Sequence, residues 1–485
     1  MLFIGVDLGT SAVKMILMDE AGKIQKTVSK RYPLFLPQTG WSEQNPEDWF
    51  EKTVDGLSEL TADADKSQIA GIGIGGQMHG LVCLDEKDQV IRPAILWNDS
   101  RSEEETGYLN RVIGTDHLAE YTANIAYAGF TAPKILWMKK AEPDNFRRIR
   151  KIMLPKDFLV YRFTGAHASD MSDASGMLLL DVRNRRWSEK MLDICGVKEK
   201  WLPKLYESSD VAGELSPGLA ERLRFPGKVK VVAGAGDNAA AAIGTGTVRN
   251  GDCNLSLGTS GTVFVSCDNF CMDGAHALHA FAHANKRYHL MGCMLSAASC
   301  NQWWYEKILG TEDYAGEQKS IRSLGENKVF YLPYLMGERS PHNDPGARSA
   351  FIGMSMDTSR EDMNQAVLEG VAFGLRDSLE IVRSLGIEVS RSKICGGGAR
   401  SGIWKKILAN ILNVTLEVPE ADEGPALGGA VLAAVGCGVF PNVEAAADQI
   451  VRVRERIEPE KELVGKYEEQ YRKFVKLYPA LKNIF

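Results

Sequence analysis

The first residues able to do chemistry stand near the start of the chain, in the segment Asp7-Leu8-Gly9-Thr10-Ser11. One apolar run precedes the acid and a second follows the turn, so the pattern predicts two strands joined by a tight turn. A Gly-Thr-Ser turn offers backbone N–H groups and hydroxyls to anionic oxygens. Asp7 is the kind of ligand that suits Mg2+ held largely through water. The segment predicts a phosphate site with a metal ligand, and a plain hairpin turn is the alternative.

A second copy of this pattern lies in the other half of the chain, at Ser256-Leu257-Gly258-Thr259-Ser260. Apolar runs flank it as well, which predicts the same strand, turn and strand. Two related turns indicate a duplicated architecture whose halves each present one loop to a shared nucleotide. The second copy has no acid at the place of Asp7, so we expect the first loop alone to serve the metal. The duplication favours phosphate binding over a bare hairpin.

A polar segment, Gly76-Gln77-Met78-His79-Gly80, follows a predicted buried strand over 69–74. Glycine-flanked polar residues between two apolar strands are poorly suited to packing alone. Ligands of α/β proteins gather at the carboxyl ends of strands. We therefore expect Met78 and His79 to contact a ligand, with a structural histidine as the alternative.

A lone acid, Asp237, follows another predicted strand over 229–233 and is followed by Asn238 and an alanine-rich helix. Negative charge is favoured at a helix N-terminus, and the preceding glycines allow another group to approach closely. The Asp237 carboxylate is thus a candidate catalytic group, and a local helix cap is the alternative interpretation.

Three glycines, Gly396-Gly397-Gly398, stand between a short strand and a helix. Such a turn suits close approach of a nucleotide. The chain has no G-x-x-x-x-G-K-[ST] loop, and no G-x-G-x-x-G follows the first strand, so a Walker A protein and a Rossmann dehydrogenase are disfavoured. Gln302, in a helix predicted over 296–307, is placed to reach a cleft.

With 485 residues the chain is too long for one ordinary hydrophobic core. We expect two domains, with the crossing in the glycine-rich stretch 244–251. Residues 1–245 would carry the first turn and Asp237, and residues 246–485 the second turn and the triple glycine.

Composition narrows the class of protein. Apolar residues at 44% and charged residues at 25% are ordinary for a globular chain, and a net charge of -6 argues against a general nucleic-acid surface. No apolar span reaches about 18 residues, and the first residues lack a basic region, so we expect no membrane segment and no signal peptide. The nine cysteines are scattered without a CxxC pair, which favours reduced thiols in the cytoplasm.

Together these motifs resemble those of the FGGY carbohydrate kinases, over nearly the whole chain. The segments that carry the resemblance are Asp7-Leu8-Gly9-Thr10-Ser11, Gly76-Gln77-Met78-His79-Gly80, Leu96-Trp97-Asn98-Asp99, Gly129-Phe130-Thr131-Ala132-Pro133-Lys134, Ser169-Asp170-Met171-Ser172-Asp173-Ala174, Gly236-Asp237-Asn238, Ser256-Leu257-Gly258-Thr259-Ser260-Gly261 and Gly396-Gly397-Gly398-Ala399-Arg400. The resemblance implies a two-domain α/β fold of the actin/hexokinase-like type (a duplicated ribonuclease H-like fold), with mixed sheets, flanking helices and a central interdomain cleft.

The resemblance also implies roles for particular residues. Asp237 would be the general base and Asp7 would hold Mg2+, so both would be catalytic. The residues in contact with the sugar would be Met78, His79, Asp237 and Asn238. The residues that bind ATP would be Thr10, Ser11, Gly258, Thr259, Gln302, Gly397 and Gly398.

The activity implied is ATP-dependent phosphorylation of D-xylulose to D-xylulose 5-phosphate, by a possible homodimer with no nucleic-acid or membrane partner. Met78 and His79 are the main sign for this sugar, because glycerol kinases carry Arg-Glu there. Two alternatives stay open. One is an FGGY kinase for another sugar or polyol, such as L-ribulose, gluconate or glycerol. The other is a non-catalytic sugar sensor or actin-like scaffold, against which the presence of both Asp7 and Asp237 argues.

Overall fold

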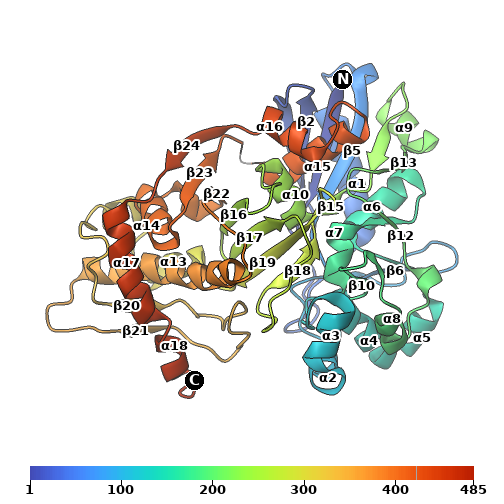
Figure 1. Cartoon of the computed structure of the whole chain (residues 1–485). Coiled ribbons are helices and arrows are strands. Elements are labelled where there is room, and N and C mark those ends of the chain that lie inside the picture. The colour runs from blue at the N-terminus through green and yellow to red at the C-terminus, as the bar shows by residue number, and fades with distance from the viewer. Residues whose placement is uncertain (422) are drawn as a thin grey trace. The chain divides into compact units, whose positions relative to one another are not determined.

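The computed structural model describes residues 1–421 and 423–485, which form two compact units built from separate stretches of chain (Figure 1). The first unit comprises Met1–Val248, Ala280–Tyr288 and Glu423–Val451. The second comprises Arg249–His279, His289–Asp422 and Arg452–Phe485. Each is an α/β structure with one large sheet, as the sequence predicted.

The sheet of the first unit mixes parallel and antiparallel strands. Its order is β13 (Val211–Glu214), β14 (Lys230–Val232), β5 (Ile69–Gly76), β1 (Leu2–Leu8), β2 (Ala12–Asp19) and β3 (Ile24–Arg31), and β15 (Ala235–Gly236) also pairs with β5. The pairs of β1 with β2 and of β2 with β3 are antiparallel, whereas β5 runs parallel to β1, β14 and β15. The predicted opening hairpin is therefore confirmed.

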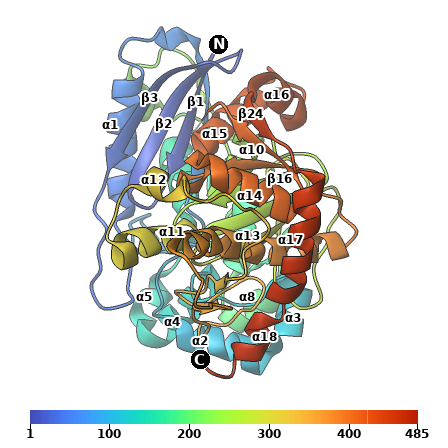
Figure 2. The ribbon, with the colours of Figure 1, turned by 90° about the vertical axis from the view of Figure 1, so that its left-hand side faces the viewer.

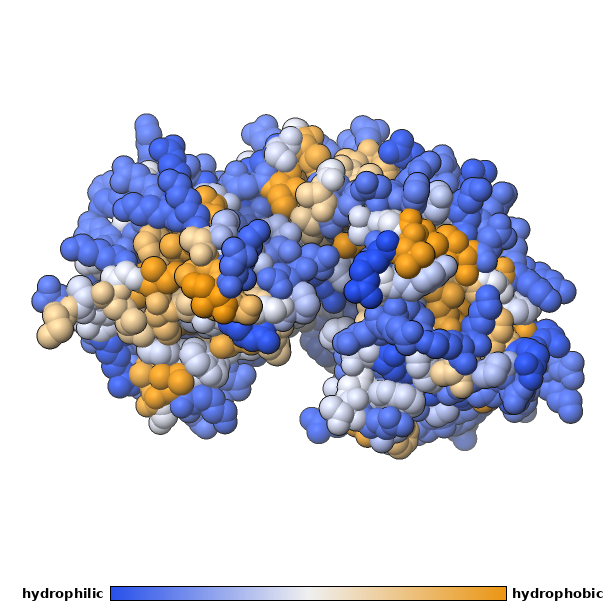
Figure 3. Space-filling view, turned by 90° about the horizontal axis from the view of Figure 1, so that it is seen from below, coloured by the Kyte–Doolittle hydropathy of each residue, from blue (hydrophilic) through white to orange (hydrophobic). Residues whose placement is uncertain are grey.

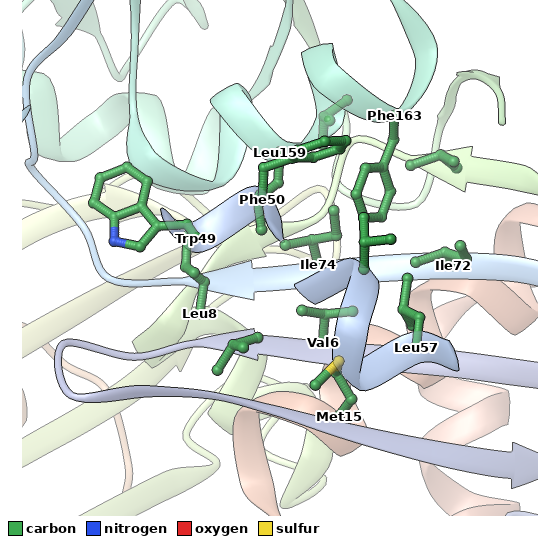
Figure 4. Close-up of a cluster of buried hydrophobic side chains, with 14 of the residues drawn as sticks. Val6, Leu8, Met15, Trp49, Phe50, Leu57, Ile72, Ile74, Leu159 and Phe163 are labelled. Atoms are coloured by element: carbon green, nitrogen blue, oxygen red, sulfur yellow. The ribbon is translucent and has the colours of Figure 1, made fainter. Parts of the chain in front are cut away.

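One face of this sheet packs against α1 (Pro46–Leu60) and α6 (Pro155–Thr164). Alternate residues of the strands point to this face, and the helices fill it with aromatic and branched side chains (Figure 4). The side chains labelled there are Val6, Leu8, Met15, Trp49, Phe50, Leu57, Ile72, Ile74, Leu159 and Phe163. Figure 2 shows β1, β2 and β3 side by side, with α1 beside them.

Helix α1 has a capped N-terminus. Asn45 is the N-cap and accepts a hydrogen bond from the Glu47 N–H at 3.2 Å, and Pro46 takes the first helical position. Trp49 is fully buried, and its Nε1 donates to Gln44 Oε1 at 3.0 Å.

The other face of the sheet is covered by α15 (Gly424–Gly436), which packs on β1, β5 and α10 (Asp237–Gly244). Gly5 and Gly73 are paired across β1 and β5. A Cβ atom on Gly5 would overlap the Ala426 carbonyl oxygen, and one on Gly73 would overlap the Gly429 carbonyl oxygen. The glycines thus let the backbone of a helix lie directly on the backbone of the sheet.

The second unit repeats this plan. Its sheet contains, in order, β19 (Tyr288–Met294), β17 (Gly261–Cys267), β16 (Cys253–Leu257), β22 (Arg391–Cys395), β23 (Thr415–Pro419) and β24 (Val453–Ile457). As in the first sheet, the hairpin strands β16 and β17 are antiparallel, and β22 runs parallel to both β16 and β23. The helices packed together on it include α13 (Arg360–Ser384), α14 (Gly402–Leu412) and α17 (Lys461–Phe474).

This repeat makes the motifs of the two units equivalent. The two Gly-Thr-Ser turns each join the antiparallel hairpin strands, β1 with β2 and β16 with β17. The segment Gln77–His79 follows β5, and the triple glycine follows the equivalent strand β22. The duplication inferred from two short motifs therefore extends to the order of the strands.

Smaller elements of the first unit surround its sheet. They include β6 (Val82–Leu84), α4 (Thr131–Ala141), β9 (Ala168–Asp170) and α7 (Met171–Ala174). In the second unit, α11 (Ala298–Gln302), a π-helix over Trp303–Leu309 and α12 (Tyr314–Gln318) follow β19. The helix predicted over 296–307 is thus divided into an α-helical and a π-helical part.

Figure 3 shows hydrophilic residues over most of one face, with separate hydrophobic patches among them. In the described part of the chain, none of the helices is long and apolar enough to cross a membrane.

Candidate active site

Three parallel strands of the first unit end in register and bring the predicted residues to one edge of the sheet. Asp7 on β1 is paired with Gly75 on β5, which is paired with Ala235 on β15. Neighbouring strands lie about 4.8 Å apart. The segments that follow these strands are the first Gly-Thr-Ser turn, Gln77–His79 and Asp237–Asn238. The carboxyl edge therefore gathers both acids and the polar segment that the sequence singled out.

The two acids act on each other. Asp237 is the first residue of α10, and burial raises the pKa of its carboxyl group to about 6. Burial, followed by the negative charge of Asp237, raises the pKa of Asp7 to about 7, although Lys14 acts in the opposite direction. Hydrogen bonds to Asp237 Oδ1 from the Asn238 backbone N–H at 2.7 Å and from Asn238 Nδ2 at 3.0 Å lower its pKa and fix its orientation.

This pair of carboxyl groups fits a hard divalent cation. Each carries a raised pKa because its negative charge is poorly solvated, and a cation beside them would favour the ionised forms. Within residues 1–421 and 423–485 no group of three or more His, Cys, Asp or Glu side chains could enclose a metal ion. Mg2+ usually keeps several waters and binds through one or two carboxylates plus substrate phosphates, and these two carboxyl groups are ligands of that type.

The first Gly-Thr-Ser turn is tied to the polar segment after β5. The Gly9 N–H donates to the Ala12 carbonyl at 3.1 Å, which closes the turn. Thr10 Oγ1 donates to Gln77 Oε1 at 3.2 Å and accepts from Trp97 Nε1 at 3.0 Å. Gln77 N–H donates to the Leu8 carbonyl at 2.8 Å. Thr10 is thus placed by Gln77 and Trp97, and Ser11 beside it is exposed.

Met78 and His79 differ in how they are held. Met78 is 4% exposed, and a Cβ on Gly236 would lie 2.9 Å from its Sδ, so it forms a wall beside Asp237. His79 has φ of 70°, donates from Nδ1 to the Gly176 carbonyl at 2.7 Å and stacks on Phe130 with ring centroids 4.6 Å apart. Because Nδ1 carries the proton in this bond, Nε2 is the acceptor nitrogen of the neutral ring.

A buried ionic cluster lies behind this edge, and the sequence did not reveal it. Lys156 Nζ is 2.6 Å from Asp157 Oδ1, 2.9 Å from Asp170 Oδ1 and 3.7 Å from Asp173 Oδ2, and all four side chains are fully buried. A Cβ on Gly76 would lie 2.9 Å from Lys156 Cβ. Burial raises the pKa of Asp173, and the charge of Asp237 adds to this effect. Asp173 is therefore linked electrostatically to Asp237.

In the second unit, the Gly-Thr-Ser turn and the triple glycine pack against each other. Gly396 has φ of 92°, and a Cβ there would lie 2.7 Å from the Leu257 carbonyl group and 3.0 Å from the Gly258 nitrogen. The Thr259 carbonyl accepts hydrogen bonds from the Ala297 N–H at 2.9 Å and from Ser299 Oγ at 2.8 Å. The close approach that the glycines were expected to permit is realised here between two turns of the protein.

These turns border a cavity of about 480 Å³, a volume ordinary for a small-molecule site. Four residues predicted to bind nucleotide line it: Thr259, Gln302, Gly397 and Gly398. Gly258 is adjacent, since its carbonyl accepts from the Ala298 N–H at 2.8 Å. Gln302 is exposed, and its Nε2 donates to the Glu306 carboxylate at 3.1 Å.

The sequence missed other residues of this cavity. Its further lining residues are Ala298, Ser299, Asn301, Tyr314, Ala315, Gln318, Arg400, Ser401 and Trp404. Ser401 caps α14 by accepting from the Trp404 N–H at 3.1 Å, and its hydroxyl donates to Gln318 Oε1 at 2.6 Å. The contact joins residues far apart in the chain, so local patterns give no sign of it.

The fold and these motifs define a family. Residues 2–244 match the FGGY family of carbohydrate kinases, N-terminal domain, and residues 253–437 match the C-terminal domain of the same family. The chain belongs to the FGGY family of carbohydrate kinases: it is an ATP-dependent sugar kinase with the actin/hexokinase-like fold that the sequence predicted.

Individual relatives resemble it over the whole length. The chain is 39% identical to a xylulose kinase of Escherichia coli (strain K12) over 484 residues, which is 99% of each chain. A crystal structure of a xyloylose kinase from Brucella ovis has a TM-score of 0.95 and 41% identity, with 100% of both chains covered. That of a gluconate kinase from Lactobacillus acidophilus has a TM-score of 0.94 and 25% identity, covering 99% of this chain and 98% of that chain.

Proposed function

We propose that this protein phosphorylates D-xylulose with ATP, giving D-xylulose 5-phosphate. The observation that carries the catalytic part is the common edge of β1, β5 and β15, where Asp7, Gln77–His79 and Asp237 follow strands paired in register. The choice of sugar is supported by the xylulose kinase of Escherichia coli, 39% identical along the whole chain. The fold alone does not separate sugars, because a gluconate kinase shares it at a TM-score of 0.94.

In this proposal Asp237 is the general base. Its pKa of about 6 leaves it mostly ionised at neutral pH and basic enough to accept the proton of a sugar hydroxyl, which we expect to be O5. Phosphoryl transfer has a loose transition state, so proton removal occurs late and the protein mainly positions groups and stabilises charge. Asn238, which donates to Asp237 Oδ1, holds the carboxylate and is a further candidate for sugar contact.

Met78 and His79 are proposed to contact the sugar. His79 offers Nε2 as an acceptor for a hydroxyl donor, because Nδ1 is engaged with the Gly176 carbonyl at 2.7 Å. Met78 contributes an apolar wall, since it is 4% exposed and lies against Gly236. A wall and an acceptor together would orient the sugar chain relative to Asp237.

Nucleotide-binding residues are proposed in each unit. In the second unit, the cavity lined by Gln302, Gly397 and Gly398 would receive the adenosine, and Gly258 and Thr259 at its border would bind phosphate oxygens. In the first unit, Thr10 and Ser11 would donate to phosphate oxygens. Asp7 would hold Mg2+, which when bound supplies positive charge that stabilises the phosphate oxygens during transfer.

The test is ADP release by the purified protein with a panel of D-xylulose, L-ribulose, gluconate and glycerol. We expect D-xylulose to give the highest kcat/KM. A clear preference for another member of the panel would refute the substrate while leaving the kinase class intact. The catalytic role is tested with Asp237→Ala, for which we expect loss of turnover by about 100-fold or more with nucleotide affinity nearly unchanged.

A homodimer and a cytoplasmic location are also proposed. In the described part of the chain the nine cysteines form no disulfide, which supports a reducing compartment. Sedimentation velocity at micromolar concentration would detect the dimer, and a monomer under those conditions would exclude it.

A further inference from the structure

A buried lysine of the first unit supports the segment that carries His79. Lys134 lies in the first turns of α4, and its side chain is fully buried. Its Nζ donates to the His79 carbonyl at 3.0 Å and to the Gly129 carbonyl at 2.5 Å. Thr131, also fully buried, donates from Oγ1 to the same His79 carbonyl at 3.0 Å. The His79 carbonyl therefore accepts two hydrogen bonds, both from side chains of α4.

The burial of Lys134 is costly and calls for a physical reason. The charges that act on it, Asp99 and Arg101, are paired with each other at 2.7 Å. Burial lowers the pKa of Lys134 to about 7, which shows how poorly the ammonium is solvated. A methionine would fill a similar volume without this desolvation. The lysine amine donates hydrogen bonds to the carbonyls of His79 and Gly129, which a methionine side chain could not do.

The carbonyl that Lys134 holds belongs to a residue in an unusual conformation. His79 has φ of 70°, which lies in the left-handed region that is unfavourable for a residue other than glycine. The second carbonyl acceptor, that of Gly129, is in a segment that packs on Trp97: a Cβ on Gly129 would lie 2.5 Å from the Trp97 carbonyl oxygen. Lys134 thus joins the segment after β5 to the loop before α4, beside the indole that donates to Thr10.

We propose that Lys134 is a positioning residue for sugar binding: its Nζ, with Thr131 Oγ1, fixes the backbone of His79 and so the direction of the imidazole. This inference rests on the proposed function, in which His79 contacts the sugar. Without the two donors the His79 backbone relaxes toward ordinary φ, and the imidazole loses its place above Phe130 and beside Gly176. The cavity proposed for the adenosine shares no lining residue with this arrangement.

The experiment compares Lys134→Met and Thr131→Val with Lys140→Met, a control on the same helix whose side chain is 61% exposed. Steady-state kinetics give kcat, the KM for D-xylulose and the KM for ATP, and thermal melting reports folding. We expect Lys134→Met to raise the sugar KM by about 10–100-fold, as loss of hydrogen bonds to a charged group implies, with kcat and the ATP KM within about threefold. Thr131→Val should raise the KM for D-xylulose by about 3–10-fold, and Lys140→Met should leave kcat and both KM values unchanged.

The outcomes separate this inference from the proposed function. If Lys134→Met melts like the parent and keeps its sugar KM, the positioning role is wrong. If Lys134→Met fails to fold, Thr131→Val decides, and an unchanged sugar KM in that variant overturns the role. His79→Asn serves as the reference: a raised sugar KM there with none in the two helix variants refutes the positioning role alone. An unchanged sugar KM in His79→Asn refutes the sugar contact and the positioning role together.

Discussion

Replacing Asp7 by asparagine should stabilise the protein at neutral pH while abolishing its activity. In the folded chain the pKa of Asp7 is about 7, against 3.8 for the unperturbed group, through burial and the charge of Asp237. Between these two values the unfolded chain releases a proton that the folded chain retains, so the free energy of unfolding falls as pH rises. Above pH 7 this decrease in the free energy of unfolding is complete. An asparagine at position 7 has no proton to release, so the variant does not lose this stability.

The size of the effect follows from the shift. Each pH unit between the two pKa values is worth about 1.4 kcal/mol, so the advantage of Asp7→Asn should grow by about 2–3 kcal/mol between pH 5 and pH 8. In a protein of this size that corresponds to roughly 5 °C in apparent melting temperature. The measurement is thermal melting in EDTA at both pH values, with Asp55→Asn, at an exposed position of α1, as the control.

Equal differences between Asp7→Asn and the parent at pH 5 and pH 8 would refute the reasoning, since they would mean that Asp7 ionises normally in the folded chain. A further arm uses Mg2+ with ADP. Because the cation would favour the ionised carboxylate, we expect the addition to raise the melting temperature of the parent more than that of Asp7→Asn. Similar increases in both would argue against Asp7 as the metal ligand.

Glycines provide the remaining predictions. A Cβ on Gly397 would meet no protein atom within 4 Å, so Gly397→Ala should raise the KM for ATP and leave melting unchanged if nucleotide occupies that cavity. Gly398→Ala should instead lower stability by about 1–3 kcal/mol in urea denaturation, because its Cβ would overlap neighbouring side chains. Gly73→Ala should destabilise by a similar amount or more, because its Cβ would overlap the Gly429 carbonyl, whereas Gly218→Ala, with open space around it, should be neutral.

Local patterns predicted the local parts of the fold well. The hairpin at Asp7 and the helix that opens at Asp237 each depend on a few neighbouring residues, and the structure has both. In both cases the physical cause lies within the segment itself.

Contacts between distant segments could not be predicted from the sequence. Lys134 and Lys156 are charged residues in helices, a pattern typical of a solvated face, and both are fully buried because other segments close over them. Their partners include the His79 carbonyl and Asp170, which no spacing rule connects to them. The roles predicted for the individual site residues stay predictions until the variants above are measured.

The return of α15 to the first sheet has a consequence for how the protein is made. Strands β1 and β5 leave the ribosome early, whereas the helix that lies on Gly5 and Gly73 is complete only at Gly436. At about 5–20 residues per second, the nascent sheet waits on the order of 20–70 s for that cover. Translation must therefore deliver most of the second unit before the first can close, and a ribosome that stalls in between leaves an uncovered sheet for chaperones to shield.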